Sequence, residues 1–188
     1  MKLGYNNFVN KPKLILIYGF AGCGKTTLAK KLNSDMPFSL LVEADGILNL
    51  IGQWIKDEDK ARGYVHSLSK SMTSTHLKSG LDVIVPMLLL DPVHAEELNL
   101  IANQENAELV ELYIHLEKED AIRYLYERGT WGESTSIKIT EADRAHIDQI
   151  YDKMIEAMKS RQHVKQITYF RGNIDLTHKE LQVLVSKQ

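Results

Sequence analysis

The sequence has little of what several classes of protein require. It contains one cysteine, Cys23, so no disulfide can form within the chain, and we expect a reducing compartment such as the cytoplasm. No apolar run approaches the roughly 18 residues of a membrane-spanning helix, so no membrane partner is expected. The N-terminal segment lacks the apolar core of a secretory signal peptide. The formal net charge is only −2, so no basic field attracts nucleic acid, which is not expected as a partner.

Two further kinds of site are missing from the sequence. The seven histidines are scattered without a pair at metal-ligand spacing, so no zinc site is predicted. The tetrapeptide Asp-x-x-Gly does not occur, and residues 10–13 (Asn-Lys-Pro-Lys) lack the aspartate that reads guanine, so a regulatory GTPase is not supported. The composition is otherwise that of an ordinary globular protein, with 44% hydrophobic and 26% charged residues among 188. A chain of this length can form one domain with a sizeable core.

The most informative segment runs from Gly19 to Thr26, where GFAGCGKT matches the phosphate-binding pattern G-x-x-x-x-G-K-[ST]. Glycines in such a loop let backbone N–H groups turn toward a polyphosphate. Lys25 supplies a positive charge at the β- and γ-phosphates, and the Thr26 hydroxyl can bind the accompanying Mg²⁺. The apolar run 14–18 precedes the loop and a helical pattern follows it, as an anion site at a helix N-terminus needs. The residues predicted to bind the nucleotide are Gly19, Ala21, Gly22, Cys23, Gly24, Lys25, Thr26 and Thr27, and Thr26 is the predicted metal ligand.

Apolar runs and helical patterns alternate along the chain. We predict strands over 14–18, 38–43, 81–87, 109–116 and 164–170. We predict helices from Thr26, from Asp91, over 117–128, after Thr140 and from Thr177, the last with Thr177 and Glu180 as a capping box, and a mixed helical stretch over about 47–78. This alternation predicts an α/β protein with three layers, in which a five-stranded parallel sheet carries helices on both faces.

We expect one domain over residues 1–188, with three subdivisions. Residues 1–12 are expected to form a short N-terminal arm, about 46–79 a helical substrate-binding insertion, and about 129–140 a polar lid loop. Ligands of parallel sheets bind beyond the carboxyl ends of the strands, where the phosphate loop also lies.

Two carboxylates follow the second predicted strand. Glu43 and Asp45 lie two residues apart, so in an extended chain their side chains point the same way, toward the phosphate and Mg²⁺. Asp45 could accept a proton from a substrate hydroxyl or hold the metal through water, and Glu43 could bind the substrate. The alternative is an ordinary turn at a strand end, where Asp-Gly is common.

Cationic and aromatic side chains on the insertion and the lid are candidates for the rest of the site. Arg128, just before the lid, could neutralise the charge of the transferring phosphoryl group, and Arg123 and Arg144 are further candidates. Trp54 and Arg62 lie in the insertion, where an acceptor would bind. The alternatives are a solvated arginine at a helix end, a core tryptophan and a surface arginine.

The third predicted strand departs from the usual pattern of phosphate-loop proteins. Such strands end in an aspartate for the metal, but Pro86 occupies that position here. Asp82 stands at the wrong end of the strand, and Asp91 is better explained as a helix N-cap. Mg²⁺ would therefore depend on Thr26, nucleotide oxygens, water and Asp45.

Together these features resemble the adenylate-kinase-like P-loop kinases, a group that includes the shikimate, gluconate and small nucleoside kinases. The run 84–87 (Ile-Val-Pro-Met), followed by Asp91-Pro92, is similar to the tunicamycin-resistance branch, which also has proline for the usual aspartate. The resemblance implies a P-loop NTPase fold, ATP and Mg²⁺ as cofactors, and a small hydroxyl-bearing acceptor such as a nucleoside, a sugar or an antibiotic, with a role in antibiotic resistance as one option. Lids of these kinases often carry an arginine near adenine four residues before the equivalent of Arg128; here Tyr124 stands there and could stack on the base.

Two other functions stay open at this point. The chain could be an ATP-binding protein or ATPase with a regulatory role and no transfer to a small molecule, because Pro86 removes an expected acid. It could also be a 5′-polynucleotide kinase, which would need a basic groove. For any of these functions, we expect the protein to be a monomer or a homodimer.

Overall fold

The computed structural model describes residues 11–132, 137–169 and 172–186. The strands are β1 (Lys13–Gly19), β2 (Leu40–Leu41), β3 (Val83–Met87), β4 (Glu108–Ile114) and β5 (Lys165–Ile167). The helices are α1 (Lys25–Asp35), α2 (Ala44–Leu50), α3 (Glu58–Lys78), α4 (Pro92–Gln104), α5 (Lys118–Arg128), α6 (Arg144–Met158) and α7 (Ile174–Ser186), with 3-10 helices η1 (Trp54–Lys56) and η2 (Glu141–Asp143). Of the predicted N-terminal arm, all but Lys11 and Pro12 lies outside the described residues.

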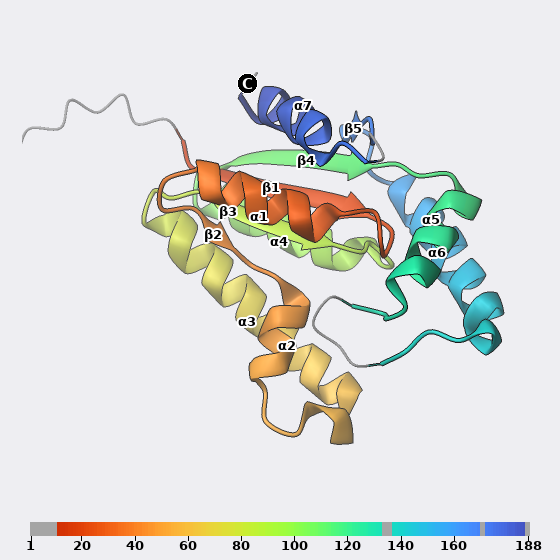
Figure 1. Ribbon diagram of the computed structural model, residues 1–188. Coiled ribbons are helices and arrows are strands. Elements are labelled where there is room, and N and C mark those ends of the chain that lie inside the picture. Colours follow the sequence, from red (N-terminus) through yellow and green to blue (C-terminus); the bar gives the residue numbers. More distant parts are fainter. Residues whose placement is uncertain (1–10, 133–136, 170–171, 187–188) are drawn as a thin grey trace, which may run out of the picture.

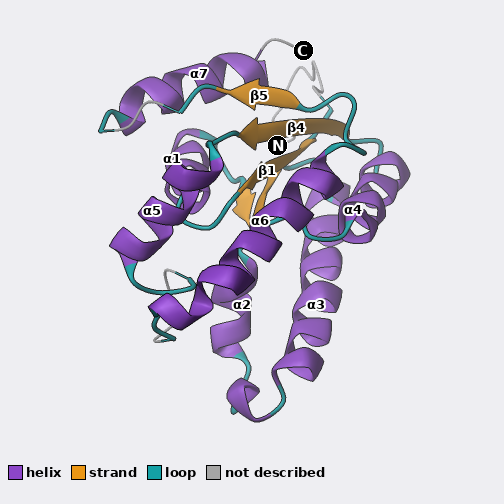
Figure 2. Ribbon diagram, turned by 90° about the vertical axis from the view of Figure 1, so that its right-hand side faces the viewer, coloured by secondary structure: helices purple, strands orange, loops and turns teal. Residues whose placement is uncertain are grey.

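The strands form one parallel sheet in the order β2-β3-β1-β4-β5, as the alternating pattern predicts (Figure 1). Residues Leu14–Tyr18 of β1 are fully buried, because this central strand is covered on both faces. Its alternate side chains belong to two separate apolar clusters: one contains residues of α1 and α7, the other residues of α3, α4 and α6 (Figure 2). The three-layer α/β fold is therefore confirmed.

Other elements also follow from local sequence signals. Asp91 accepts a hydrogen bond from Val93 N (2.9 Å) and caps α4, so its predicted structural role is confirmed. Gly129 ends α5 in the left-handed conformation at φ 76°. Thr140 forms a capping box with Asp143 at the start of η2, which leads directly into α6.

The mixed helical stretch predicted over about 47–78 is present as α2, a turn, η1 and α3, but several predicted boundaries are wrong. The second strand covers only Leu40–Leu41, because the chain leaves the sheet and enters α2 at Ala44. The fifth strand, predicted over 164–170, covers only Lys165–Ile167 among the described residues. The last helix begins at Ile174, so Thr177 lies inside it and is buried. Glu180 accepts a hydrogen bond from Thr168 N (3.1 Å) beside β5, which explains why the two residues form no capping box.

Pro86 lies in β3 without interrupting its pairing with β1, which continues to Met87. On the other side of β3, β2 pairs with Val83 and Ile84, and Val42 N donates the last of these bonds to Ile84 O (2.9 Å). In a parallel strand, the backbone groups of residues two apart face the same neighbour, so the Pro86 nitrogen faces Val42, just after the end of β2. Proline has no N–H to donate there, so the ladder between β2 and β3 does not extend further.

Within the described residues, no helix combines the length and the apolar character that crossing a membrane requires.

Candidate functional site

The phosphate loop connects β1 to α1 at the carboxyl edge of the sheet (Figure 1). Gly22 and Gly24 have φ values of 86° and 82°, in the region that favours glycine. The loop is closed by a hydrogen bond from Cys23 N to Phe20 O (3.3 Å), and α1 begins at Lys25. The first turn of α1 carries no acidic side chain, so nothing in that turn opposes an anion at the helix N-terminus. The predicted structural context of the motif is thus present.

The loop packs tightly against its surroundings. A Cβ on Gly22 would lie 3.1 Å from Leu125 N, so the last turns of α5 support the loop from behind. A Cβ on Gly19 would lie 2.5 Å from Cys23 Sγ. Close backing of this kind fixes the directions of the loop N–H groups, which is what a preorganised anion site needs.

The polar side chains of the motif lie at the start of α1. Lys25 is half-buried, and its Nζ donates to Phe20 O (3.3 Å), so the ammonium folds back along the loop. Thr26 is half-buried in the first turn and Thr27 is exposed. Ala21 belongs to the loop, and its side chain is buried in the apolar cluster on the α4 and α6 side of the sheet.

The pKa of the Cys23 thiol depends on burial and on nearby charges. The thiol is fully buried, and burial raises the pKa of that thiol, while the charges of Lys25 and Arg128 act in the opposite direction. A buried thiol with a raised pKa is an unreactive packing group. The charges of Lys25 and Arg128 therefore both reach the phosphate loop, although Arg128 is more than a hundred residues farther along the chain.

Arg128 is the last residue of α5, and the segment after it pairs with itself. Arg128 donates from Nε to Thr130 O (2.9 Å) and from Nη2 to Trp131 O (2.5 Å). Thr130 and Lys138 form an antiparallel bridge. The described part of the predicted lid is thus the base of a hairpin; residues 133–136 of that prediction lie outside the described residues.

Glu43 and Asp45 are placed differently from the prediction. Glu43 is extended at the N-cap of α2, but Asp45 lies in the first helical turn, so the two side chains do not share one face of a strand. Glu43 Oε2 lies 3.9 Å from Lys30 Nζ of α1, which brings it beside the helix that follows the phosphate loop. Asp45 is half-buried in that turn. Its role in proton transfer stays a prediction.

The insertion residues have structural partners of their own. Trp54 begins η1, is half-buried and packs against the core. Arg62 is half-exposed on α3, and its Nη2 donates to Glu58 Oε1 (2.6 Å), a pairing typical of a solvated helix face. Substrate binding by Trp54 or Arg62 stays a prediction.

An aromatic pair stands beside the N-terminus of α1. Tyr124 on α5 and Tyr169 after β5 have ring centroids 6.1 Å apart, and the guanidinium of Arg123 lies 5.2 Å from the Tyr124 ring. A Cβ on Gly24 would lie 3.7 Å from Tyr169, which places this ring against the phosphate loop. Tyr169 was not among the predicted site residues, although its position near the end of the predicted strand 164–170, at the carboxyl edge, was an available signal.

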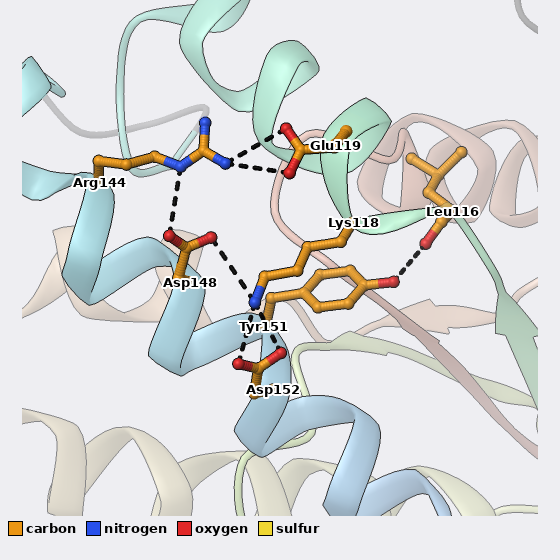
Figure 3. A network of polar contacts seen from close by, with 7 residues as sticks. All are labelled: Leu116, Lys118, Glu119, Arg144, Asp148, Tyr151 and Asp152. Carbon is orange, nitrogen blue, oxygen red and sulfur yellow. Dashed lines mark hydrogen bonds and ion pairs between the residues drawn. The ribbon is translucent and has the colours of Figure 1, made fainter.

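The two helices that flank the lid are tied together by charge (Figure 3). Lys118 of α5 contacts Asp152 (2.8 Å) and Asp148 (3.7 Å) of α6. Arg144 of α6 contacts Asp148 (3.3 Å) of the same helix and Glu119 (3.2 Å) of α5. Arg144 and, through an ion pair with Asp120, Arg123 thus have structural partners.

Comparison with known proteins agrees with this architecture. A model of the AAA domain family matches residues 14–156, which is most of the chain. No similar sequence is found among curated proteins.

Solved structures share the fold at low sequence identity. A gluconokinase from Sinorhizobium meliloti 1021 is 14% identical, with a TM-score of 0.62 over 95% of this chain and 94% of that chain. The tunicamycin resistance protein of Deinococcus radiodurans is also 14% identical, with a TM-score of 0.59 over 92% of this chain and 95% of that one. A chain of the Pnkp1/Rnl/Hen1 RNA repair complex is 16% identical, with a TM-score of 0.64. The match covers 82% of this chain but only 48% of that chain.

Proposed function

The chain belongs to the AAA domain family and has a P-loop kinase-like fold, and from this premise we propose that it is an ATP- and Mg²⁺-dependent phosphotransferase. It moves the γ-phosphoryl group of ATP to a hydroxyl group of a small molecule. The observation that carries the proposal is the phosphate loop at the start of α1, with Lys25 folded along it and Arg128 at the end of the helix that packs against Gly22 of the loop. Two such charges suit a reaction whose transition state spreads negative charge over the transferred group.

In this proposal each part of the site has a separate task. The loop amides and the N-terminus of α1 hold the phosphates, and Lys25 neutralises the β- and γ-phosphates. Arg128 stabilises the charge of the phosphoryl group in transfer. Asp45, at the N-terminus of α2, accepts the proton of the acceptor hydroxyl or organises the water around the metal.

The residues present fit Mg²⁺ in one respect. Thr26 follows the loop lysine in the first turn of α1, where its hydroxyl can reach a metal bound to nucleotide oxygens. Elsewhere in the described part of the chain, no group of three or more His, Cys, Asp or Glu side chains gathers to form a metal site. Mg²⁺ would therefore be held by Thr26, phosphate oxygens and water, which is within its preference for keeping several waters. Bound there, it would polarise the γ-phosphate.

Tyr124 and Tyr169 are suited to bind the adenine base. The Tyr169 ring lies against the phosphate loop at Gly24 and the Tyr124 ring lies beside it, and aromatic rings bind bases by stacking. The acceptor is proposed only by class: a nucleoside, a sugar or an antibiotic, of which the gluconokinase name suits the second and the tunicamycin resistance name the third. The single buried cysteine supports a reducing compartment such as the cytoplasm.

The proposal is tested by phosphoryl transfer from labelled ATP to a panel of nucleosides, sugars and hydroxyl-bearing antibiotics. Transfer to one class should fall by at least about 100-fold in Lys25→Ala and in Arg128→Ala, since each removes a charge that stabilises the transition state. Asp45→Asn should lower kcat with little change in the KM for ATP. ATP binding without transfer to any acceptor would overturn the proposal.

Two other functions have observations in their favour. An ATPase or regulatory ATP-binding protein is favoured by Pro86 at the usual position of a metal-binding acid. Its sign would be ATP hydrolysis that no acceptor increases. A 5′-polynucleotide kinase is favoured only by the likeness to the RNA repair chain. Transfer to a 5′-hydroxyl oligonucleotide that falls steeply with salt would support it. Sedimentation during turnover would distinguish a monomer from a homodimer.

A further inference from the structure

The base of the lid is built around Arg128. Besides the two hydrogen bonds from its guanidinium to the carbonyls of Thr130 and Trp131, Trp131 N donates to Ile137 O (3.2 Å) and Ile139 N donates to Gly129 O (3.1 Å). The Thr130 hydroxyl donates to Gly132 O (2.9 Å). Two carbonyls hold the plane of the guanidinium, so the direction of Arg128 depends on the position of this backbone.

Trp131 anchors that backbone to the body of the protein. Its side chain is half-buried and packs against the core cluster that contains α6. Its ring centroid lies 5.7 Å from that of His146 on α6, in an edge-to-face arrangement. One residue thus contributes both an acceptor for Arg128 and a large apolar anchor for the turn.

The same side of α5 faces the phosphate loop. The backbone of Leu125 and Tyr124 lies against Gly22, at 3.1 and 3.2 Å from a Cβ built there. Arg128 follows these residues by three and four positions, so it lies on the same face of the helix, one turn closer to the lid. Its charge acts on Cys23 in the loop, which agrees with this placement.

We infer that Trp131 is a positioning residue, which fixes the guanidinium of Arg128 beside the phosphate loop before substrate binds. The inference rests on the proposed role of Arg128 and adds that the arginine is preorganised by the lid turn. A charge that is already in place needs no reorganisation when the transition state forms, so the benefit is lost when the turn loosens.

The test measures how strongly the protein prefers a triphosphate, which needs no acceptor. The dissociation constants of an unreactive ATP analogue and of ADP, both with Mg²⁺, are compared by calorimetry in the wild type, Arg128→Ala, Trp131→Ala, Trp131→Phe and the double alanine variant. We expect the preference for the analogue to fall about 10-fold in each single alanine variant, because each loses a charged hydrogen bond to the γ-phosphate. Trp131→Phe should keep most of the preference, since phenylalanine restores the anchor.

The double variant carries the decisive comparison. If Trp131 acts through Arg128, Trp131→Ala should cost nothing further in the Arg128→Ala background. Additive losses, an unchanged preference in Trp131→Ala, or a wild type that does not distinguish the analogue from ADP would each overturn the inference.

A matched control is Tyr126→Ala. Tyr126 also packs on the core and holds the far end of the lid through Thr140 O (3.3 Å), while the carbonyls that bind Arg128 belong to other residues. An equal loss in this variant would mean general loosening of the lid and would also overturn the inference. Lack of transfer to every acceptor, with the triphosphate preference and its Trp131 dependence intact, would instead remove only the proposed function.

Discussion

At the scale of single residues, two glycines of the phosphate loop exclude a side chain for different reasons. Gly22 has a φ of 86°, so an L-residue there would be strained whatever the space around it. At Gly19 the obstacle is volume, because a Cβ would lie 2.5 Å from Cys23 Sγ and 3.3 Å from Ile114 O. The motif alone does not distinguish these two cases.

The same substitution should therefore have opposite effects at two glycines. Gly19→Ala is expected to lower the free energy of unfolding by about 1–3 kcal/mol through overpacking. Gly63→Ala, inside α3 with nothing within 4 Å of its Cβ position, should raise it by about 0.5–1 kcal/mol because alanine favours the helix. Urea unfolding of both variants measures the difference.

A second substitution identifies the clash at Gly19. Cys23→Ala removes the sulfur that the new methyl group would meet, so Gly19→Ala should cost less in that background than in the wild type. Strictly additive losses would show that Ile114 O, rather than Cys23, sets the limit.

At the scale of elements, helices α3 and α4 meet at a pair of histidines. The rings of His66 and His94 are stacked, with centroids 4.4 Å apart. His94 Nδ1 is buried and has no hydrogen-bond partner among the described residues, although Glu97 Oε2 lies 3.7 Å away. Burial lowers the pKa of His94, the charge of His66 adds to this, Glu97 opposes it, and the charge of Lys70 lowers the pKa further. The contact between the helices therefore favours the neutral imidazole.

Acid should weaken this contact. Because the pKa of His94 is lower in the folded protein than in the unfolded chain, the unfolded chain binds the extra proton first as the pH falls below about 6.5. The free energy of unfolding should thus decrease from pH 7 toward pH 5, by at most about 1.4 kcal/mol per pH unit from this group. His94→Gln should show a shallower decrease in urea unfolding across that range. Equal slopes would assign the acid sensitivity to other residues.

The connection between α5 and α6 should respond to salt instead. Lys118, Asp148, Asp152, Arg144 and Glu119 form a network of partly or fully exposed side chains (Figure 3), and such pairs weaken when salt shortens the screening length from about 10 Å at 0.1 M to about 3 Å at 1 M. Stability in urea should fall more with salt in the wild type than in Lys118→Met, which keeps much of the side-chain volume. The same salt dependence in both would show that the network contributes nothing measurable.

Elements were predicted well where their signals are local and poorly where they depend on partners. The buried run of β1, the Asp91 cap of α4 and the Gly129 end of α5 follow from neighbouring residues in the sequence. The short β2 does not, because its length depends on where the chain leaves β3. Lys25 and Thr26 lie at the start of α1 as their motif predicts, whereas Asp45 was expected in extended chain after a strand because nothing local marks the start of α2. The contact of Trp131 with His146 and that of Tyr169 with Gly24 join residues far apart in the sequence and arise only from the tertiary fold.

At the scale of the whole molecule, nucleotide binding should stabilise the fold. A ligand that binds only the native state adds about 2.7 kcal/mol at a concentration of about 100 times its Kd. For a chain of this size, ATP with Mg²⁺ should raise the unfolding temperature by roughly 5–10 °C. Differential scanning calorimetry with Lys25→Ala as the control tests this, and an equal rise in that variant would show that the nucleotide binds elsewhere. Thr26→Ala should lose the part of the shift that depends on Mg²⁺.

The position of Pro86 has a consequence for how this chain could change over generations. Because its nitrogen faces the chain just beyond β2, exchange between proline and another residue changes at most one hydrogen bond, the one at the end of that strand. Backbone pairing thus imposes little selection on this site, and a lineage could gain or lose an acidic side chain there with little change in the stability of the sheet. The absence of that acid is then a matter of chemistry and history rather than of architecture.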